Sequence, residues 1–576
     1  MKLARMSVIG ILVGCLGVTA ALLARYQQSA AAPASLAAYA PQGGLLAVES
    51  PDFAALVESW MSSPEEQRWL ASDNYAGFSR SRLFAQLGDA QSQFVATAGL
   101  PVDARFVQQI AGQQSLLVLY DIHSLEFLYI TRMPAGEAEK TPLLALKSKF
   151  EERKVGDTSF YVRTDGDPAR TVAFAVRGDY LLLATSEDKM AAALQLMQQP
   201  SDRTLKSEGW YANTVAAAAR QAGDLRMTLN LTQIVASPYF RSYWVQQNVT
   251  QMKQYSAGLS DLYRDAAAFR EERVLLKSDP EQKFVSADLT PVLAYASAKS
   301  GVYRAMAQPD AEMVLAQMQD KVLDRTPSAF RDAHEAPVAD LSTPQAGDTT
   351  SLEERIDEPV VVSTVRSTQL KPLSDLLNAM PAQAMLVYSA SETPASGLTT
   401  MHAAVALSSS TPWDAAGLQN AISAAMAPKL TVGAAGLSWQ EQKSGSLQLM
   451  ELSGMQPLAL AVSGNIFVLA TDRATLLRMM NAAANVPAPR MAQVAGTVAG
   501  FDHSSERDTF THLTATLDQY HPDKTAKKNS GNPPPFFAGN MASLSNTFQD
   551  LSAETFTETA TPDNVVHQSV LYEWKK

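Results

Sequence analysis

The spacing of apolar positions changes along the chain, from helical spacing in residues 52–112 to strand spacing after residue 115. Within the helical part, Ser63, Pro64 and Glu66 match the start of a helix. The serine is suited to cap it, the proline suits its first turn, and the glutamate can close a capping box. Residues 52–112 are therefore expected to be mainly helical.

Short apolar runs bounded by turn residues follow this helical part. They predict strands at 116–121 and 126–133, a helix at 140–153, strands at 159–163, 171–177 and 180–185, and a helix at 186–198. The strand at 126–133 has apolar or aromatic side chains on both faces, which is typical of a strand in the middle of a sheet. Residues 256–277, "SAGLSDLYRDAAAFREERVLLK", predict a helix followed by a strand.

One segment of this pattern occurs twice. "AFAVRGDYLLLATSEDK" at 173–189 is similar to "ALAVSGNIFVLATDRAT" at 459–475. In both, a glycine, Gly178 or Gly464, stands where a tight hairpin needs a positive φ. A weaker similarity joins the strand predicted at 43–50 to "MPAQAMLVYSA", which begins at residue 380. These similarities indicate two related halves.

The resulting fold class is α+β, with two related halves, each a mainly antiparallel sheet with packed helices, and one N-terminal helix. The expected organisation is an anchor or signal segment at 1–25, a tether at 26–42, a first domain with a helical insertion at 43–323, a linker at 324–359 and a second domain at 360–576. The linker is rich in Pro, Asp, Glu, Ser and Thr, a composition that disfavours a packed core.

The N-terminus predicts a membrane anchor. Lys2 and Arg5 precede an uncharged, mostly apolar run at 6–24, about long enough to cross a bilayer as a helix. The positive charges favour a cytoplasmic N-terminus, so the body would lie in the periplasm. A cleaved signal and a lipoprotein acylated on Cys15 are the alternatives. Cys15 is the single cysteine, so the exported body can hold no disulfide, thiol nucleophile or cysteine-ligated metal.

Composition and charge narrow the possible partners. The chain has 576 residues, of which 46% are hydrophobic and 18% charged, as in globular proteins that bury substantial cores. Its net charge is −11, which would repel phosphate backbones and argues against nucleic acid as a partner.

The residues with catalytic or metal-binding character do not form convincing sites. Ser186 and Lys189 have the spacing of penicillin-recognising serine enzymes, but the second copy replaces them with Asp472 and Thr475. We interpret this segment as the start of a helix capped by Thr185.

Three histidines, His503, His512 and His521, recur every nine residues. Nine residues turn a helix by about two and a half turns, so neighbouring histidines would point in opposite directions. The sequence therefore predicts no catalytic residues, no cofactor and no metal.

Two aromatic segments are the candidate binding surfaces. In "SPYFRSYWVQQN" the side chains of Tyr239, Phe240, Tyr243 and Trp244 would share one broad helical face, with Arg241 beside them. In "PPPFF", Phe536 and Phe537 follow three prolines. Either segment could dock a partner, and either could equally be part of the core.

Several segments resemble a group of uncharacterised bacterial exported proteins with an N-terminal anchor and a duplicated α+β body. They are "LYDIHSLEFLYITRM", "VAFAVRGDYLLLAT", "SPYFRSYWVQQN" and "FREERVLL". The resemblance implies a compartment but no activity. We expect a non-enzymatic, envelope-anchored interaction or scaffold protein, which binds the cytoplasmic membrane through residues 6–24 and has an envelope protein or apolar ligand as partner. The alternatives are an exported hydrolase acting on an envelope polymer, and a carrier of lipid or another apolar ligand between the two halves.

Overall fold

The computed structural model describes residues 35–72, 75, 79, 82–166, 169–218, 221–237, 252–265, 268–279, 281, 283–296, 301–323, 370–392, 400–430, 437–444, 447–452, 457–485, 490–509, 550–561, 563 and 565–574. The predicted anchor, the predicted linker and both aromatic candidate surfaces lie outside these residues. Within the described part of the chain, no helix combines the length and the apolar character that a membrane crossing requires.

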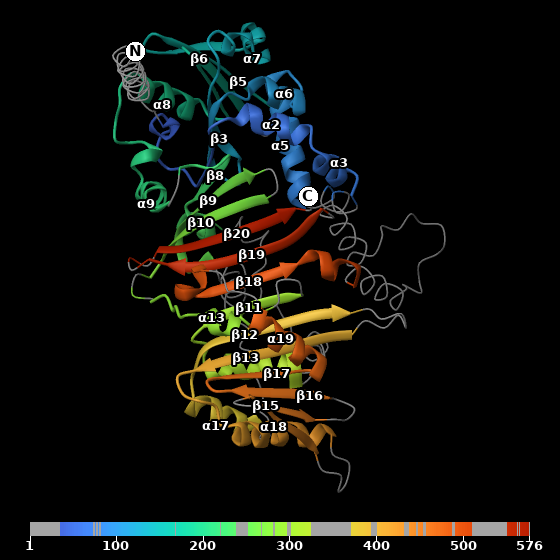
Figure 1. Cartoon of the computed structure of the whole chain (residues 1–576). Coiled ribbons are helices and arrows are strands. Elements are labelled where there is room, and N and C mark those ends of the chain that lie inside the picture. Colours follow the sequence, from blue (N-terminus) through green and yellow to red (C-terminus); the bar gives the residue numbers. More distant parts are fainter. Residues whose placement is uncertain are drawn as a thin grey trace, which may run out of the picture.

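The described residues are arranged around one long, twenty-stranded sheet whose pairings are all antiparallel (Figure 1). Its first strands are β1 (Leu46–Ser50), β2 (Gln114–Asp121), β3 (Glu126–Arg132), β4 (Glu151–Val155), β5 (Thr158–Asp165), β6 (Arg170–Arg177), β7 (Tyr180–Ala184), β8 (Leu225–Leu229), β9 (Tyr255–Asp265) and β10 (Ala268–Lys277). The remaining strands are β11 (Val302–Ala307), β12 (Ala382–Glu392), β13 (Thr400–Ser409), β14 (Trp439–Ser444), β15 (Leu447–Leu452), β16 (Leu458–Ser463), β17 (Ile466–Ala470), β18 (Thr497–Asp502), β19 (Leu551–Ala560) and β20 (Val565–Trp574). The α+β class is confirmed.

The helices connect these strands and cover both faces of the sheet. Those between β1 and β10 are α2 (Phe53–Met61), α3 (Pro64–Leu70), α5 (Arg82–Ala98), α6 (Ala104–Ile110), α7 (Pro142–Ala145), α8 (Glu187–Gln198), α9 (Gly209–Ala217) and α10 (Leu231–Ala236). Those that follow are α13 (Thr290–Leu293), α14 (Ala311–Met318), η5 (Gln319–Leu323), α17 (Lys371–Ala379), α18 (Ala415–Leu430), α19 (Arg473–Asn485) and the short η7 (Arg490–Val494). We call β1 to β10 with their helices the first half, and β11 to β20 with theirs the second half.

The two halves have the same internal strand order. In the first half the neighbouring strands run β4, β5, β6, β7, β3, β2, β1, β8, β9, β10. In the second half they run β14, β15, β16, β17, β13, β12, β11, β18, β19, β20. Strands β10 and β20 pair with each other, so the halves meet along a single seam.

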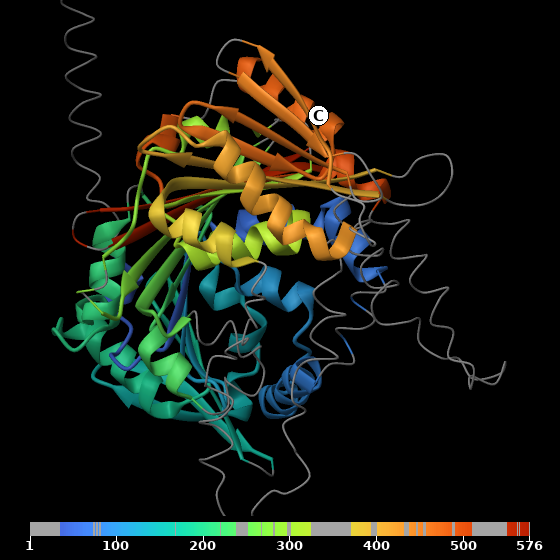
Figure 2. The ribbon, with the colours of Figure 1, turned by 90° about the horizontal axis from the view of Figure 1, so that it is seen from below.

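Helices lie on both sides of this sheet, which is bent (Figure 2). We call the side inside the bend the inner side. It carries α5 and α6 in the first half and α17 and α18 in the second. The first half has one core under α8 on the outer face and another under α5 and α6 on the inner face. The second half has corresponding cores under α19 and under α14, α17 and α18. A sheet buried on both faces explains why many strands are apolar throughout.

Several local predictions are confirmed. Ser63 accepts a hydrogen bond from the Glu66 backbone N–H at 3.2 Å and caps α3. Gly178 and Gly464 have φ values of +56° and +58° in the hairpins β6–β7 and β16–β17. Strand β3 is central in its half, between β2 and β7.

Other local predictions are wrong. Residues 140–153 form short helical turns followed by β4, because Phe150 packs into the inner core and the chain then extends beside β5. The predicted helix within 256–277 is strand β9, which pairs with both β8 and β10. Two strand partners outweigh the local helix preference of its sequence.

The position of β11 also differs from the expected organisation. It lies within the range that we assigned to the first domain, yet it pairs with β12 and β18. In the first half, β1 lies between β2 and β8, just as β11 lies between β12 and β18 in the second half. By strand order the counterpart of β1 is therefore β11, and "MPAQAMLVYSA" forms β12, the counterpart of β2.

Candidate functional site

The inner face of the first half contains an apolar cavity of about 430 Å³. Its floor follows from the alternation of side chains along a strand. On β2, Leu116 and Val118 point to the outer core and are fully buried, whereas Leu117 and Leu119 point inward and line the cavity. Phe127 on β3 extends this floor.

Helices α5 and α6 form the roof of the cavity. Phe94 of α5 stacks on Phe127 with ring centroids 6.3 Å apart, and Phe106 of α6 is almost completely buried. Leu87 of α5 also lines the cavity and is 44% exposed, so the cavity reaches the surface beside this helix. Its volume falls within the range of about 300–1,000 Å³ that is usual for small-molecule sites.

The polar groups around the cavity bond to the protein itself. The hydroxyl of Ser115 contacts those of Tyr129 and Thr131 at 3.2 and 2.6 Å, and the Tyr129 hydroxyl donates to the Ile110 carbonyl at 3.0 Å. Burial raises the pKa of Tyr129. The partners of these hydroxyls are other hydroxyls and a backbone carbonyl, none of which is a base that could activate a nucleophile. With its polar groups paired inside the protein, the cavity is suited to an apolar occupant.

A second, polar pocket adjoins the cavity. Arg170, Thr171 and Thr185 line both. The remaining lining residues of the polar pocket are Ser124, Glu126, Ala169, Ser186, Glu187 and Asp188. The Arg170 side chain is held in place, since its Nε donates to Gln93 Oε1 at 2.6 Å and its Nη1 donates to the Ser124 carbonyl. The first half thus combines the apolar cavity with an adjoining polar pocket.

The corresponding face of the second half is filled. Leu183 and Leu469 occupy equivalent positions in the two halves. Leu183 of β7 pairs with Tyr129 of β3, and Leu469 of β17 pairs with Val405 of β13, so the two leucines identify the same face of the sheet. In the second half, side chains from the covering helices and from the loop before α18 pack on the sheet with exposures of 5% or less. The helix residues include Val314, Met318, Leu373, Leu377 and Ile422, and the loop residue is Trp413. In the first half, by contrast, Leu183 lines the cavity.

Ser186 and Lys189, the pair with catalytic spacing, have structural contacts. Ser186 Oγ accepts a hydrogen bond from the Lys189 backbone N–H at 3.4 Å and caps α8, while Lys189 Nζ lies 4.1 Å from the centre of the Tyr120 ring. The prediction that Thr185 is the cap is wrong. Its hydroxyl instead accepts from the Phe127 backbone N–H at 2.9 Å, which ties the end of β7 to β3.

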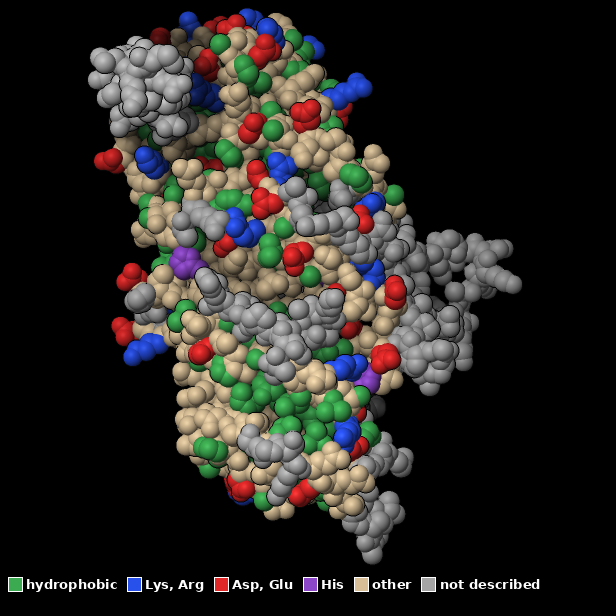
Figure 3. Space-filling view, viewed as in Figure 1, with side chains coloured by type: hydrophobic (Ala, Val, Ile, Leu, Met, Phe, Trp, Pro, Cys, Tyr) green, Lys and Arg blue, Asp and Glu red, His purple; other side chains and the backbone are tan. Residues whose placement is uncertain are grey.

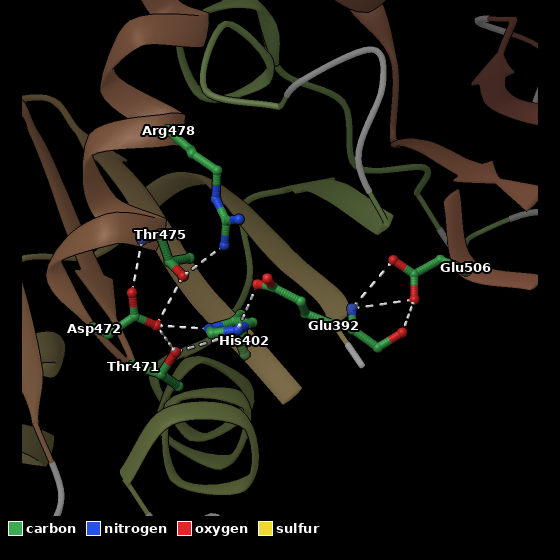
Figure 4. Close-up of polar contacts among 9 residues, drawn as sticks. Glu392, His402, Thr471, Asp472, Thr475, Arg478 and Glu506 are labelled. Atoms are coloured by element: carbon green, nitrogen blue, oxygen red, sulfur yellow. Dashed lines mark hydrogen bonds and ion pairs between the residues drawn. The ribbon is translucent and has the colours of Figure 1, made fainter. Parts of the chain in front are cut away.

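A polar cluster in the second half surrounds His402 (Figure 4). The ring lies between two carboxylates, with Nδ1 2.8 Å from Asp472 Oδ2 and Nε2 3.6 Å from Glu392 Oε2. Asp472 caps α19 by accepting from the Thr475 backbone N–H at 2.8 Å. Burial alone would raise the pKa of Asp472, but the hydrogen bonds from Thr475 and His402 outweigh it and lower the pKa to about 2.

This cluster is better explained as the cap of helix α19 than as a catalytic site. The hydroxyls of Thr471 and Thr475 donate to Asp472 at 3.1 and 2.8 Å, and the two nitrogens of the His402 ring face the carboxylates of Asp472 and Glu392. Within the described residues, the imidazole therefore activates no hydroxyl that could serve as a nucleophile.

The described residues contain no group of three or more His, Cys, Asp or Glu that could hold a metal ion. His503 Nε2 lies 3.7 Å from Glu554 Oε2, and His512 and His521 are outside the described residues.

Comparison with known proteins assigns no family. No protein-family model and no curated protein matches the chain. Two crystal structures of the Treponema protein TP0453 show a distant structural similarity. Crystal form III aligns with 44% of this chain and 84% of TP0453, at 9% identity and a TM-score of 0.25. Crystal form I aligns with 44% and 82%, at 9% identity and a TM-score of 0.24. TM-scores this low carry no argument about fold or function.

Sequence reasoning placed binding elsewhere. All seven candidate surface residues, Tyr239, Phe240, Arg241, Tyr243, Trp244, Phe536 and Phe537, lie outside the described residues. The cavity was missed because inward apolar positions such as Leu117 and Leu119 look the same in a sequence whether a helix fills the space above them or not. The apolar character of both faces of β3 was the available signal.

The exposed surface offers a weaker candidate. On the face seen in Figure 3, charged side chains of both signs are scattered over the first half, and apolar side chains gather over the second. Leu477 of α19 and Val494 of η7 are 38% and 65% exposed. Nothing in the structure indicates what would cover them.

Proposed function

We propose that this protein is a non-enzymatic, membrane-anchored envelope protein that binds an apolar ligand in the cavity of its first half. The observation that supports this proposal is the chamber of about 430 Å³ between β2, β3 and the helices α5 and α6. The sequence had suggested a ligand between the two halves only as an alternative to an interaction or scaffold role, whereas this cavity lies within one half.

A cavity of this kind destabilises a protein when it is empty. Its apolar walls lose packing contacts, and the loss grows with the volume left unfilled. The second half, with the same strand order, fills the corresponding space with helix side chains. This difference supports a cavity that is kept open for a ligand. We further propose that the halves arose by duplication, with the division between β10 and β11, and that only the first kept a binding role.

The proposal can be tested with Nile red, a neutral dye that fluoresces in apolar surroundings. The full chain should bind the dye with saturation. Leu117→Trp and Ala90→Phe each place a larger side chain in the cavity, from the floor and from the roof. Both variants should lose most of the dye binding, and their thermal stability should be unchanged or higher because the cavity is filled.

The matched control is Met401→Trp, which adds the same indole to a side chain that is 58% exposed on the second half. It should bind the dye like the unmodified chain. Full dye binding by both cavity variants would overturn the proposal, and so would a chain that binds no dye at all.

The anchor is a separate part of the proposal. Residues 6–24 are expected to hold the chain in the cytoplasmic membrane, so replacing residues 1–25 with a cleavable secretory signal should release the chain into the soluble periplasmic fraction. Cys15→Ser should leave the chain in the membrane fraction. If mass spectrometry of the unmodified chain shows that it begins at an acylated Cys15, the lipoprotein alternative is correct.

The hydrolase alternative has little support from the described residues. The best-organised polar cluster, around His402, holds its imidazole between carboxylates and presents no activated hydroxyl. Release of fragments from purified envelope polymers by the unmodified chain would favour that alternative.

A further inference from the structure

The polar pocket beside the cavity indicates the chemical class of the ligand. This inference rests on the proposed function. A purely apolar molecule would need only the apolar cavity between β2, β3, α5 and α6. The cavity, however, adjoins the polar pocket at Arg170, Thr171 and Thr185, which line both spaces. A molecule long enough to reach this junction would need a polar end.

The charges of the polar pocket disfavour a negative end. Glu126, Glu187 and Asp188 carry three carboxylates there, against the single guanidinium of Arg170. Glu187 is partly compensated by Arg153, whose Nε lies 3.4 Å away. The carboxylates of Glu126 and Asp188 form no hydrogen bond or ion pair with the described part of the chain. An anionic group would therefore meet uncompensated negative charge.

The start of α8 does not reverse this balance. Helix N-termini attract anions through free backbone N–H groups and the helix dipole. Here Ser186 supplies the cap, and Glu187 and Asp188 already place negative charge in the first turn. The free N–H groups and the dipole at this end of the helix are thus already compensated by Ser186, Glu187 and Asp188.

Arg170 disfavours a positive end for a different reason, its position: it lines both spaces, so a head group that emerges from the cavity meets this guanidinium at the junction. Its guanidinium is fixed by Gln93 and Ser124, and its Nη2 keeps donors that can serve a ligand oxygen. An end group with hydroxyls can accept a hydrogen bond from Arg170 and donate to Glu126 or Asp188, without bringing a charge into the pocket.

We propose that the ligand is a single-chain amphiphile, with its hydrocarbon chain in the apolar cavity and an uncharged, hydroxyl-bearing head in the polar pocket. The hydrocarbon chain supplies the affinity through buried apolar area, and the head fixes its orientation.

The test compares dodecyl amphiphiles that differ only in the head, each used below the concentration at which it forms micelles. Glycerol monododecanoate, dodecanoate and dodecylamine are titrated against Nile red bound to the full chain at neutral pH. The glycerol ester should displace the dye at a concentration about tenfold lower than dodecanoate does, because the carboxylate meets like charges. It should also displace the dye at a lower concentration than dodecylamine does.

Glu126→Gln and Asp188→Asn probe the origin of this preference. Each removes one negative charge from the polar pocket at nearly constant shape, and should improve displacement by dodecanoate several-fold relative to the glycerol ester. Glu139→Gln makes the same change at an exposed position beyond the far end of β3 and should leave the preference unchanged.

The outcomes separate this inference from the proposed function. If dodecanoate or dodecylamine displaces the dye as well as the glycerol ester does, or if Glu126→Gln and Asp188→Asn do not shift the preference, the assignment of the head is wrong. If the dye binds but no amphiphile displaces it, the amphiphile proposal fails and the apolar-ligand proposal stands. If the cavity-filling variants bind the dye like the unmodified chain, both fail.

Discussion

Ser569 Oγ lies 3.1 Å from Glu272 Oε1 and donates a hydrogen bond across the seam between β20 and β10. The two residues are paired in register, in a ladder that runs from Ala268 opposite Glu573 to Leu276 opposite Val565. Without this ladder each half would end in an exposed strand edge, a site that invites pairing with other chains. The seam therefore makes one sheet out of two.

The seam should depend on its buried apolar side chains. Val570 is 3% exposed between the halves, so Val570→Ala should lower the free energy of unfolding by about 2 kcal/mol, measured by chemical denaturation. Val494→Ala removes the same two methyl groups from a side chain that is 65% exposed, and should change the stability by less than about 0.5 kcal/mol. Equal effects of the two changes would contradict a packed seam.

The buried ion pair of the first half should be sensitive to loss of one partner. Arg226 Nε and Nη2 donate to the two oxygens of Asp261 at 2.7 and 2.6 Å, and both side chains are almost completely buried. Asp261→Ala leaves a buried, unpaired guanidinium and should lower the free energy of unfolding by about 3–5 kcal/mol.

A double variant and a surface pair provide the controls for this prediction. Arg226→Met combined with Asp261→Leu removes both charges and should recover most of the loss. Asp375→Ala breaks the exposed pair with Lys371 and should change the stability by less than about 1 kcal/mol. Failure of the double variant to recover would show that the pair itself, and not the stranded charge, supplies the stability.

Glu49 should make the fold less stable as pH rises. Burial raises the pKa of Glu49, against the hydrogen bond from Tyr211 and the attraction of Arg226. A carboxyl whose pKa is raised by folding contributes its full stability below its unfolded pKa, and loses it as pH rises through the folded value. Glu49→Gln should therefore gain melting temperature relative to the unmodified chain as pH rises above about 4.5, the ordinary value. Glu139→Gln should show no such trend.

Asp472 should have the opposite pH dependence. Folding lowers its pKa from 3.8 to about 2, so its contribution is full above the unfolded value and is lost as pH falls through the folded one. Asp472→Ala should lower the free energy of unfolding by about 1–2 kcal/mol near neutral pH, and by progressively less between pH 3.8 and about 2.

Ser186→Ala is the matched control for Asp472, because Ser186 caps α8 as Asp472 caps α19 and its hydroxyl does not titrate in this range. It should lose a similar stability at every pH. A loss for Asp472→Ala that does not change with pH would rule out the carboxylate as its source.

Local sequence rules accounted for much of the fold. The hairpins around Gly178 and Gly464 follow from the need for a positive φ between two apolar runs, and the cap of α3 follows from Ser63, Pro64 and Glu66. These features depend on residues a few positions apart, so the sequence displays them directly.

Strand β9 and the segment at 140–153 were predicted wrongly because their conformation depends on distant partners. Residues 255–265 pair with β8 and β10, and these contacts override the local preference for helix. The N-cap of α8 was displaced by one residue because Thr185 uses its hydroxyl to hold β3, a contact across 58 positions of sequence.

The sequence by itself determined the α+β class, several of the strands, the two repeated hairpins and the lack of a cysteine beyond Cys15, because periodicity, turn residues and composition act locally. The tertiary structure decided which strands are neighbours, where the halves join and whether the space above Leu117 is filled. The inner faces around Leu183 and Leu469 are apolar in both halves, yet Leu183 lines a cavity, whereas Leu469 is packed among side chains of the covering helices. That difference arises from how helices distant in sequence settle on the sheet, which the apolar pattern of a strand does not specify.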